Sequence, residues 1–226
     1  MPQRKQNVVV VDYQAGNLFS IENACKSVGL NPVFTNNTKE IFKADALILP
    51  GVGAFGEAMI NIRRLDLVQP LREFAECGKP LMGICLGMQL LFSESQEFGH
   101  HKGLDVIKGY VAKFPVNGFR HEKIRVPQMG WNQIISPSFN DSSYWDGSPL
   151  EKIKSGEFMY FVHSFYVMPE STDNFLAITN YADIEYASGV IKENVWGFQF
   201  HPEKSGSEGL KIFKNFKDII VGDCHD

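Results

Sequence analysis

The chain has 226 residues and a formal net charge of -4, with 44% apolar and 21% charged residues. These totals are typical of a soluble globular protein, and they favour a single domain over residues 1–226. A net negative charge without a basic stripe does not suit a nucleic-acid surface. The first apolar run, Val8 to Val11, is too short for a membrane span or a signal-peptide core, so we expect a cytoplasmic protein.

The first half of the chain alternates short apolar runs with amphipathic segments. Short apolar runs predict buried strands, and apolar residues three or four positions apart predict helices. The alternation favours an open, mostly parallel sheet flanked by helices, with ligands at the carboxyl ends of the strands. The predicted strands are Asn7 to Asp12, Pro32 to Phe34, Ala44 to Leu49 and Pro80 to Ile84, and the predicted helices are Leu18 to Val28, one from Phe55, Leu67 to Cys77 and Leu86 to Phe92.

The second half of the chain has a different pattern. From Gly109 onward, short β-like runs predict antiparallel additions and hairpins to this α/β sheet. The polar segment 136–157 interrupts them, and its Ser148-Pro149-Leu150-Glu151 sequence predicts one short helix with a capping box. A last helix is predicted over Ser207 to Val221. The β-like runs are Gly109 to Phe114, Ile124 to Val126, Trp131 to Ile135, Phe158 to Val162, Phe175 to Thr179, Ala187 to Ile191 and Val195 to Phe200.

Cys85 lies between a predicted strand and a predicted helix, with Gly83 and Gly87 two residues before and after it. This is the spacing of a nucleophile elbow, in which a larger side chain at either glycine would collide with the turn. We therefore predict an exposed thiol at a helix N-terminus, where free N–H groups favour the thiolate. The alternative is a small buried apolar residue. The glycine pattern favours the nucleophile.

The four cysteines lie far apart, at positions 25, 77, 85 and 224. None of their spacings is typical of a zinc site or of a disulfide framework. We expect reduced thiols, no metal and no cofactor.

A cysteine nucleophile needs a base and a group that orients the base. His201 directly follows a predicted strand, and Pro202 stiffens the link to Glu203, whose carboxylate is then within reach of the imidazole. By itself such a sequence is also compatible with a surface turn. His163 ends another predicted strand, where it either lines the site or makes a structural hydrogen bond.

An oxyanion hole is predicted from backbone N–H groups near Cys85. One donor is Leu86, the residue after the nucleophile, and another comes from the glycine-rich loop that includes Val52 and Gly53. Together with the thiol and the imidazole, these donors predict acyl transfer. They do not specify the acyl group.

Two motifs, Gly83-Ile84-Cys85-Leu86-Gly87-Met88-Gln89 and Gly197-Phe198-Gln199-Phe200-His201-Pro202-Glu203-Lys204-Ser205, resemble those of class I glutamine amidotransferases, whose triad is Cys-His-Glu. Three further stretches look like the glutaminase subunit of imidazole glycerol phosphate synthases. They are Asp12-Tyr13 with Gly16-Asn17-Leu18, Pro50-Gly51-Val52-Gly53-Ala54-Phe55, and Met129-Gly130-Trp131-Asn132. The resemblance covers nearly the whole chain.

The resemblance implies that Cys85 attacks the side-chain amide of L-glutamine, that His201 protonates the departing ammonia, and that Glu203 orients His201. It also implies a glutamine site around Gly53, Gln89, Ser164 and Phe165. Trp131, Tyr160 and Lys204 match positions that in the family lie toward the synthase partner and the ammonia path.

Free ammonia is lost to water and is mostly protonated there, so such a glutaminase needs an acceptor site that this chain has no room for. The resemblance implies a heterodimer with a (β/α)₈-barrel cyclase that forms imidazole glycerol phosphate and AICAR in histidine biosynthesis. The chain departs from the family at Gln14, where a glycine is usual, and in a longer 136–157 segment.

Three alternatives stay open at this point. An amidotransferase paralogue that supplies ammonia for an amidino sugar in surface polysaccharide synthesis would share the chemistry. A stand-alone cysteine peptidase or γ-glutamyl hydrolase on a similar sheet is disfavoured by Gln89 and the motifs around it. A non-catalytic binding protein would be expected to lack a triad residue, and none is missing.

Overall fold

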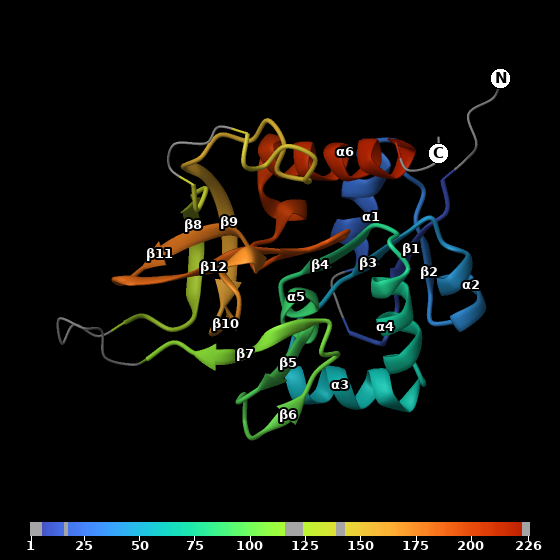
Figure 1. Cartoon of the computed structure of the whole chain (residues 1–226), viewed down its shortest axis with the longest axis horizontal. Coiled ribbons are helices and arrows are strands. Elements are labelled where there is room, and N and C mark those ends of the chain that lie inside the picture. The colour runs from blue at the N-terminus through green and yellow to red at the C-terminus, as the bar shows by residue number, and fades with distance from the viewer. Residues whose placement is uncertain (1–5, 16–17, 116–123, 139–142, 223–226) are drawn as a thin grey trace.

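The computed structural model describes residues 6–15, 18–115, 124–138 and 143–222. Within these residues, 11 strands form one sheet, in the order β2-β1-β3-β4-β13-β12-β10-β7-β5-β6, with β11 paired to β12 (Figure 1). The parallel half consists of β2 (Val33–Thr35), β1 (Val8–Val11), β3 (Ala46–Leu49), β4 (Leu81–Ile84) and β13 (Val195–Phe198).

The sheet continues mainly antiparallel beyond β13, and this confirms the predicted fold class. Strand β5 alone runs parallel to its neighbour β7 in this half of the described sheet. A separate two-stranded ribbon pairs β8 (Gln128–Ile134) with β9 (Glu157–His163). The remaining strands are β5 (Phe92–Ser95), β6 (His101–Lys102), β7 (Ile107–Lys113), β10 (Phe165–Pro169), β11 (Phe175–Tyr181) and β12 (Ile184–Lys192).

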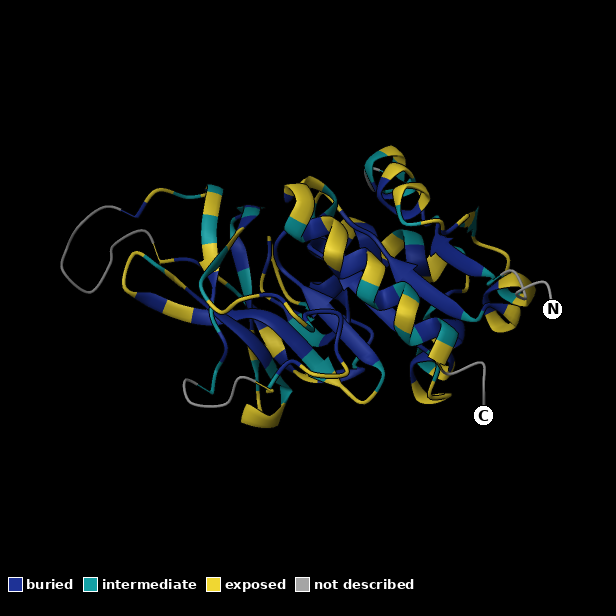
Figure 2. Cartoon of the chain, turned by 90° about the horizontal axis from the view of Figure 1, so that it is seen from above, coloured by how far each residue is buried: buried dark blue, intermediate teal, exposed yellow. Residues whose placement is uncertain are grey.

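Helices cover both faces of the parallel half of the sheet. Successive residues of each strand point to opposite faces, so each strand contributes apolar side chains to both helix layers. Val8 and Val10 pack with α1 (Leu18–Ser27) and α6 (Gly206–Gly222). The intervening Val9 and Val11 belong to the cluster on the other face, with α2 (Thr38–Lys43), α3 (Phe55–Arg64), α4 (Val68–Glu76) and α5 (Leu86–Leu90). The strands are therefore buried on both sides, whereas the helices keep one exposed stripe (Figure 2).

The structure corrects the sequence-based prediction at several elements. The helix predicted to reach Phe92 ends at Leu90, and Phe92 begins β5. No strand forms at Ile124 to Val126, and α2 was not predicted. The helix predicted at Ser148 is absent: the segment forms successive turns, and Lys152 adopts a φ of 62°, which a right-handed helix cannot accommodate.

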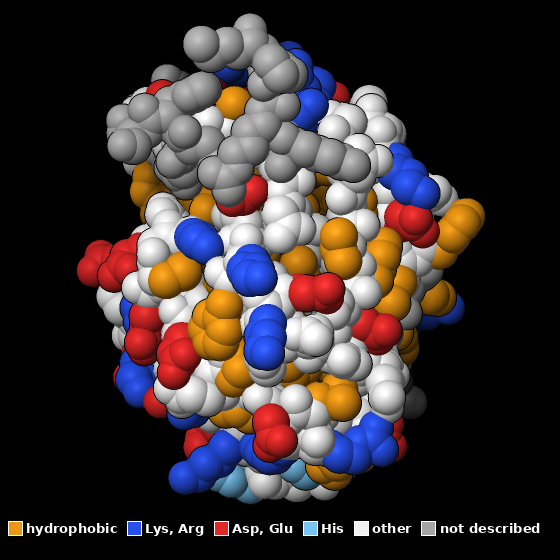
Figure 3. All heavy atoms as spheres, turned by 90° about the vertical axis from the view of Figure 1, so that its right-hand side faces the viewer, with side chains coloured by type: hydrophobic (Ala, Val, Ile, Leu, Met, Phe, Trp, Pro, Cys, Tyr) orange, Lys and Arg blue, Asp and Glu red, His pale blue; other side chains and the backbone are white. Residues whose placement is uncertain are grey.

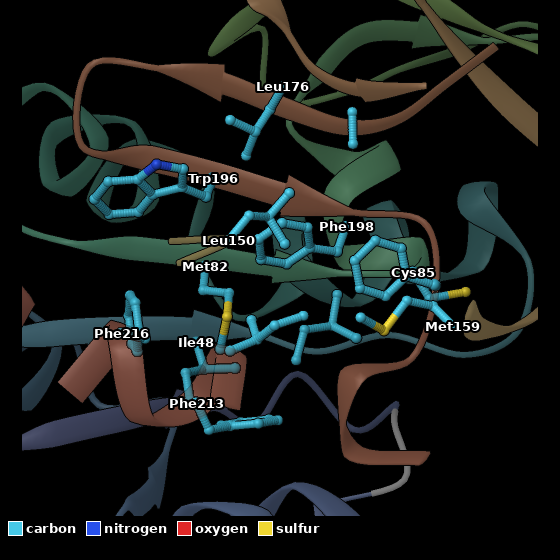
Figure 4. Packing of buried hydrophobic residues seen from close by; sticks show 14 of the residues in the cluster. Ile48, Met82, Cys85, Leu150, Met159, Leu176, Trp196, Phe198, Phe213 and Phe216 are labelled. Carbon is cyan, nitrogen blue, oxygen red and sulfur yellow. The ribbon is translucent and has the colours of Figure 1, made fainter. Parts of the chain in front are cut away.

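The described part of segment 136–157 packs against the rest of the domain. The Trp145 indole N–H donates to the Leu176 carbonyl at 2.7 Å, and the Asn215 amide donates to the carbonyls of Pro149 and Glu151. Leu150 is fully buried in the cluster that Figure 4 shows. The described part of this segment therefore joins β11 to α6.

Gln14 adopts a left-handed φ of 66°, the conformation that glycine tolerates best, and its side-chain oxygen accepts a hydrogen bond from Arg64. Gln14 therefore has a backbone conformation that glycine would also adopt. Gly16, Asn17 and Cys224 lie outside the described residues.

One face of the molecule intersperses cationic and anionic side chains (Figure 3). Among the helices in the described ranges, none is long and apolar enough to cross a bilayer.

Gly87→Ala tests the close packing at the β4–α5 junction. A Cβ at Gly87 would lie 1.9 Å from the carbonyl oxygen of Leu49, in a central strand. We expect the free energy of unfolding to fall by more than about 3 kcal/mol, because the backbone has to move. Gly222→Ala is the control, since no other part of the described chain outside its own helix lies within 4 Å of its Cβ position, and we expect a change below about 1 kcal/mol. Urea unfolding followed by circular dichroism measures both, and equal midpoints would contradict this packing.

Candidate active site

Cys85 occupies a sharp corner between β4 and α5, with a φ of 54° and a ψ of -111°. Its backbone N–H donates to the Phe198 carbonyl of β13 at 2.7 Å. A Cβ at Gly83 would lie 2.9 Å from the Met88 nitrogen, and one at Gly87 would meet the backbone of β3. The predicted corner is therefore present, and both flanking glycines are sterically required.

The prediction of an exposed thiol is wrong. Cys85 is only 7% exposed and lies at the end of a buried cluster, beside Met159 (Figure 4). Its sulfur also contacts the Val162 carbonyl of β9 and the side chain of Gln199, which cover the corner. A reagent or substrate must therefore reach the thiol through a cavity.

A cavity of about 410 Å³ opens onto Cys85 at the carboxyl ends of the central strands. Its walls contain most of the site residues that were predicted from the sequence, and these residues come from four separate parts of the chain. They are Val52, Gly53, Leu86, Gln89, Ser164, Phe165 and His201. Glu97, Pro127, Val162 and His163 complete the described lining.

His201 and Glu203 form a buried pair at the edge of this cavity. The imidazole Nδ1 lies 2.7 Å from Glu203 Oε1, and the two side chains are 3% and 2% exposed. Within the described residues His201 Nε2 makes no hydrogen bond, which leaves this nitrogen free to exchange a proton. The backbone N–H of His201 donates to the Tyr160 carbonyl of β9 at 2.9 Å.

The electrostatic surroundings of His201 favour its protonated form. Burial by itself lowers the pKa of His201, but the interactions with the Cys85 thiol and with Glu203 outweigh burial and raise the pKa to about 10. The imidazole therefore carries a proton at neutral pH, next to a thiol that can become an anion. This is the pairing that activates a cysteine nucleophile.

Gln89 has a fixed orientation on α5. Its amide nitrogen donates to the Phe165 carbonyl and to Gln199 Oε1, both at 3.0 Å. With both N–H groups engaged, the amide oxygen is the atom left to accept a hydrogen bond from a ligand in the cavity.

Two further polar side chains line the cavity. Glu97 Oε2 accepts from the Phe55 N–H at 2.6 Å, and burial raises the pKa of this carboxyl group. His163 lines the cavity and also forms hydrogen bonds with the Phe165 carbonyl and the Tyr186 hydroxyl. It therefore has both roles that the sequence allowed, as a residue of the cavity wall and as a structural hydrogen-bonding group. Burial lowers the pKa of His163 to about 4, so its ring is neutral at pH 7.

Sequence reasoning missed Glu97 and Gln199. Nothing in the sequence around Glu97 singles out one carboxylate. Gln199 had a signal, since it is a polar residue in the apolar run Val195 to Phe200, and it is fully buried.

Trp131, Tyr160 and Lys204 do not line this cavity. Trp131 is 56% exposed on β8 and meets the Tyr160 ring edge-on at 6.0 Å. Lys204 is exposed in the short 3₁₀ turn that carries Glu203. Tyr160 is connected to the His201–Glu203 pair, because its carbonyl accepts a hydrogen bond from the His201 backbone N–H.

Within the described residues, no group of three or more His, Cys, Asp or Glu side chains is placed to hold a metal ion. What the site offers is a thiol beside a protonated imidazole, a carboxylate that orients the imidazole, and a cavity for a small polar ligand. This arrangement can perform acyl transfer through a thioester.

Comparisons with known proteins agree with this chemistry. The chain matches the family described as glutamine amidotransferase class-I over residues 9–219. It is 44% identical over 210 residues to the imidazole glycerol phosphate synthase subunit HisH of Aquifex aeolicus, covering 92% of this chain and 95% of that one. It is 43% identical over 214 residues to subunit HisH 1 of Legionella pneumophila (strain Paris), covering 94% and 99%.

A solved structure, that of PurLQS from Thermotoga maritima, aligns with a TM-score of 0.71 at 20% identity, covering 95% of this chain and 99% of that one. At this identity the likeness shows the fold alone. The family match spans most of the chain, and the relatives above 40% identity cover nearly all of it. The chain therefore belongs to the class I glutamine amidotransferase family.

Proposed function

We propose that this protein is the glutaminase subunit of an imidazole glycerol phosphate synthase, which hydrolyses L-glutamine and passes ammonia to a cyclase subunit for histidine biosynthesis. The observation that carries the proposal is the position of Cys85, at a strained corner in the same cavity as the buried His201–Glu203 pair. Identity of 44% to a HisH subunit over 92% of the chain supports the pathway.

In the proposed reaction the Cys85 sulfur attacks the side-chain carbonyl carbon of glutamine. The oxygen of the tetrahedral intermediate is stabilised by N–H groups of Leu86 and of the Val52–Gly53 loop, which line the same cavity. His201 gives its proton to the departing ammonia, which leaves a thioester. Water, deprotonated by His201, then cleaves the thioester to release glutamate and restore the thiol.

The cavity offers complementary groups to the rest of glutamine. The Gln89 amide oxygen can accept a hydrogen bond from the substrate, because both of its N–H groups are engaged. Glu97 supplies a carboxylate for the α-ammonium group. Ser164, which joins β9 to β10, and Phe165, the first residue of β10, line the same cavity and complete the proposed glutamine site.

The β8–β9 ribbon is the proposed docking surface for a (β/α)₈-barrel cyclase. Its register places Trp131 opposite Tyr160, and Met129, Trp131 and Phe158 are 63%, 56% and 49% exposed. The ribbon is connected to the site, because the Tyr160 carbonyl accepts a hydrogen bond from the His201 backbone N–H. We place the complex in the cytoplasm, and the three described cysteines, Cys25, Cys77 and Cys85, are free.

The first test measures glutamine turnover with and without purified cyclase subunit. We expect weak activity from the chain alone and strong stimulation by the cyclase. Cys85→Ser is expected to lower the stimulated rate by roughly 10³-fold or more, because the serine hydroxyl is a far weaker nucleophile. Cys77→Ser is the control, since Cys77 is exposed and lies outside the cavity.

Equal rates for wild type and Cys85→Ser would remove Cys85 from the mechanism. Full activity without the cyclase would contradict the subunit assignment. Growth of a histidine auxotroph that lacks its own glutaminase subunit tests the pathway, and failure to restore growth despite stimulated glutaminase activity would point to another acceptor.

Glu203→Gln tests the protonation of His201. Since burial lowers the pKa of His201 and Glu203 helps to raise it to about 10, removal of this carboxylate moves the pKa down. The imidazolium is then lost at lower pH, so we expect the alkaline limb of the kcat/KM profile to shift by at least about one unit toward acid, with kcat reduced roughly a hundredfold. Glu208→Gln on α6, which removes a surface pair with Lys211, is the control. An unshifted alkaline limb in Glu203→Gln would be inconsistent with this role.

Trp131→Ala tests the docking surface. The side chain is exposed, so we expect an unchanged melting temperature and unstimulated rate, but an affinity for the cyclase at least about tenfold weaker, as is typical for loss of an interface tryptophan. Ile60→Ala, which removes a side chain that is 59% exposed on α3, is the matched control. Isothermal titration calorimetry measures both affinities, and equal losses in the two variants would argue against the ribbon.

A further inference from the structure

Two buried side-chain amides join the Phe165 carbonyl to the Cys85 sulfur. The Gln89 nitrogen lies 3.0 Å from the Phe165 oxygen and 3.0 Å from Gln199 Oε1, and the Gln199 nitrogen lies 3.7 Å from the sulfur. Gln89 is 5% exposed and Gln199 is fully buried. Buried amides are held in place by their hydrogen bonds, so this series has a defined geometry.

The direction of the hydrogen bonds is fixed at one end. The Phe165 carbonyl can only accept, so Gln89 must turn its NH₂ group toward it. The second N–H of that group points at Gln199, which must therefore present its oxygen. The opposite end of the Gln199 amide is then the NH₂ group, and it faces Cys85. Any reversed amide would place two donors or two acceptors against each other.

The backbone of β13 places Gln199 against the nucleophile. The Gln199 N–H donates to the Ser188 carbonyl at 2.9 Å, directly beyond the last residue of β13. Two residues earlier, Gly197 faces α5, since its Cβ would lie 2.4 Å from Met88 Cγ. Gln199 points to the same side by strand alternation.

We propose that Gln199 is a further catalytic residue, whose side-chain N–H donates to the Cys85 sulfur and stabilises the thiolate before and during attack. The proposal deepens the glutaminase function proposed above and rests on it for its effect on turnover. Gln199 also accepts a hydrogen bond from the Gln89 amide nitrogen. One side chain therefore orients both the nucleophile and a proposed substrate-binding group.

The sulfur has different partners in its two protonation states. The neutral thiol can donate to the Val162 carbonyl, 4.0 Å away. The thiolate cannot donate, and a carbonyl dipole beside it is unfavourable, whereas the Gln199 N–H is attracted to the anion. The imidazolium of His201 provides the charge, and Gln199 provides a fixed donor that needs no rearrangement when the anion forms.

The test measures alkylation of Cys85 by iodoacetamide, which reports the reactive thiolate and needs no glutaminase activity. The background is Cys77→Ser, which removes an exposed competing thiol, and mass spectrometry locates the label. In Gln199→Leu we expect alkylation at pH 7.5 to slow about tenfold and stimulated kcat to fall by a similar factor. Gln199→Met is the second variant, since its unbranched side chain fits the same space if leucine prevents folding.

Gln128→Leu is the matched control, because Gln128 is also a buried glutamine near the site but bonds Tyr186 and not the sulfur. We expect wild-type alkylation in this variant. A folded Gln199 variant, judged by circular dichroism and melting temperature, that is alkylated at the wild-type rate overturns the proposal, whatever its turnover. If alkylation is slowed in the Gln199 variants but the unsubstituted protein shows no glutaminase activity with any cyclase, the N–H···S interaction is supported and the proposed glutaminase function is wrong.

Discussion

The parallel pairing of β4 with β13 is the constraint on which the site depends. In this register Ile84 lies opposite Phe198, and the Phe198 carbonyl accepts from the Cys85 N–H. The residues that follow both strands therefore emerge side by side, although more than a hundred positions separate them in the sequence. Cys85 lies between β4 and α5. Gln199 and His201 lie between β13 and the 3₁₀ turn that contains Glu203.

Close packing of backbone against backbone keeps this corner rigid. The Gly87 backbone lies against the carbonyl of Leu49, and Gly51 approaches the backbone nitrogen of Gly87. A non-glycine residue at a φ of 54° is strained, and such strain persists only where the surroundings determine it. The thiol is thus held by the sheet itself, which suits a group that must meet a substrate at a fixed position.

Burial and charge are balanced differently at the two histidines near the cavity. Burial is the main cause that lowers the pKa of His163, and the charge of His201 lowers it further, so the ring stays uncharged despite its hydrogen bond to the Phe165 carbonyl. His201 is also buried, but the thiol and Glu203 supply enough favourable interaction to keep it protonated. The β9 strand contacts both sides of this arrangement, since the Tyr160 carbonyl holds His201 and the Val162 carbonyl contacts the sulfur. The β8–β9 ribbon is therefore connected to both His201 and Cys85 through one strand.

The sequence by itself determined the features that depend on local steric constraints and on the spacing of apolar residues. The alternation of strands and helices, the mixed sheet and the corner at Cys85 followed from apolar spacing and from glycines at fixed offsets. The strand pairing that surrounds the corner decided what the sequence could not: the burial of the thiol and the placement of Glu97 and Gln199. It also ended the helix at Leu90 rather than Phe92, because Phe92 pairs with Ile107 in the sheet. These features arise from contacts between distant segments, which local pattern does not encode.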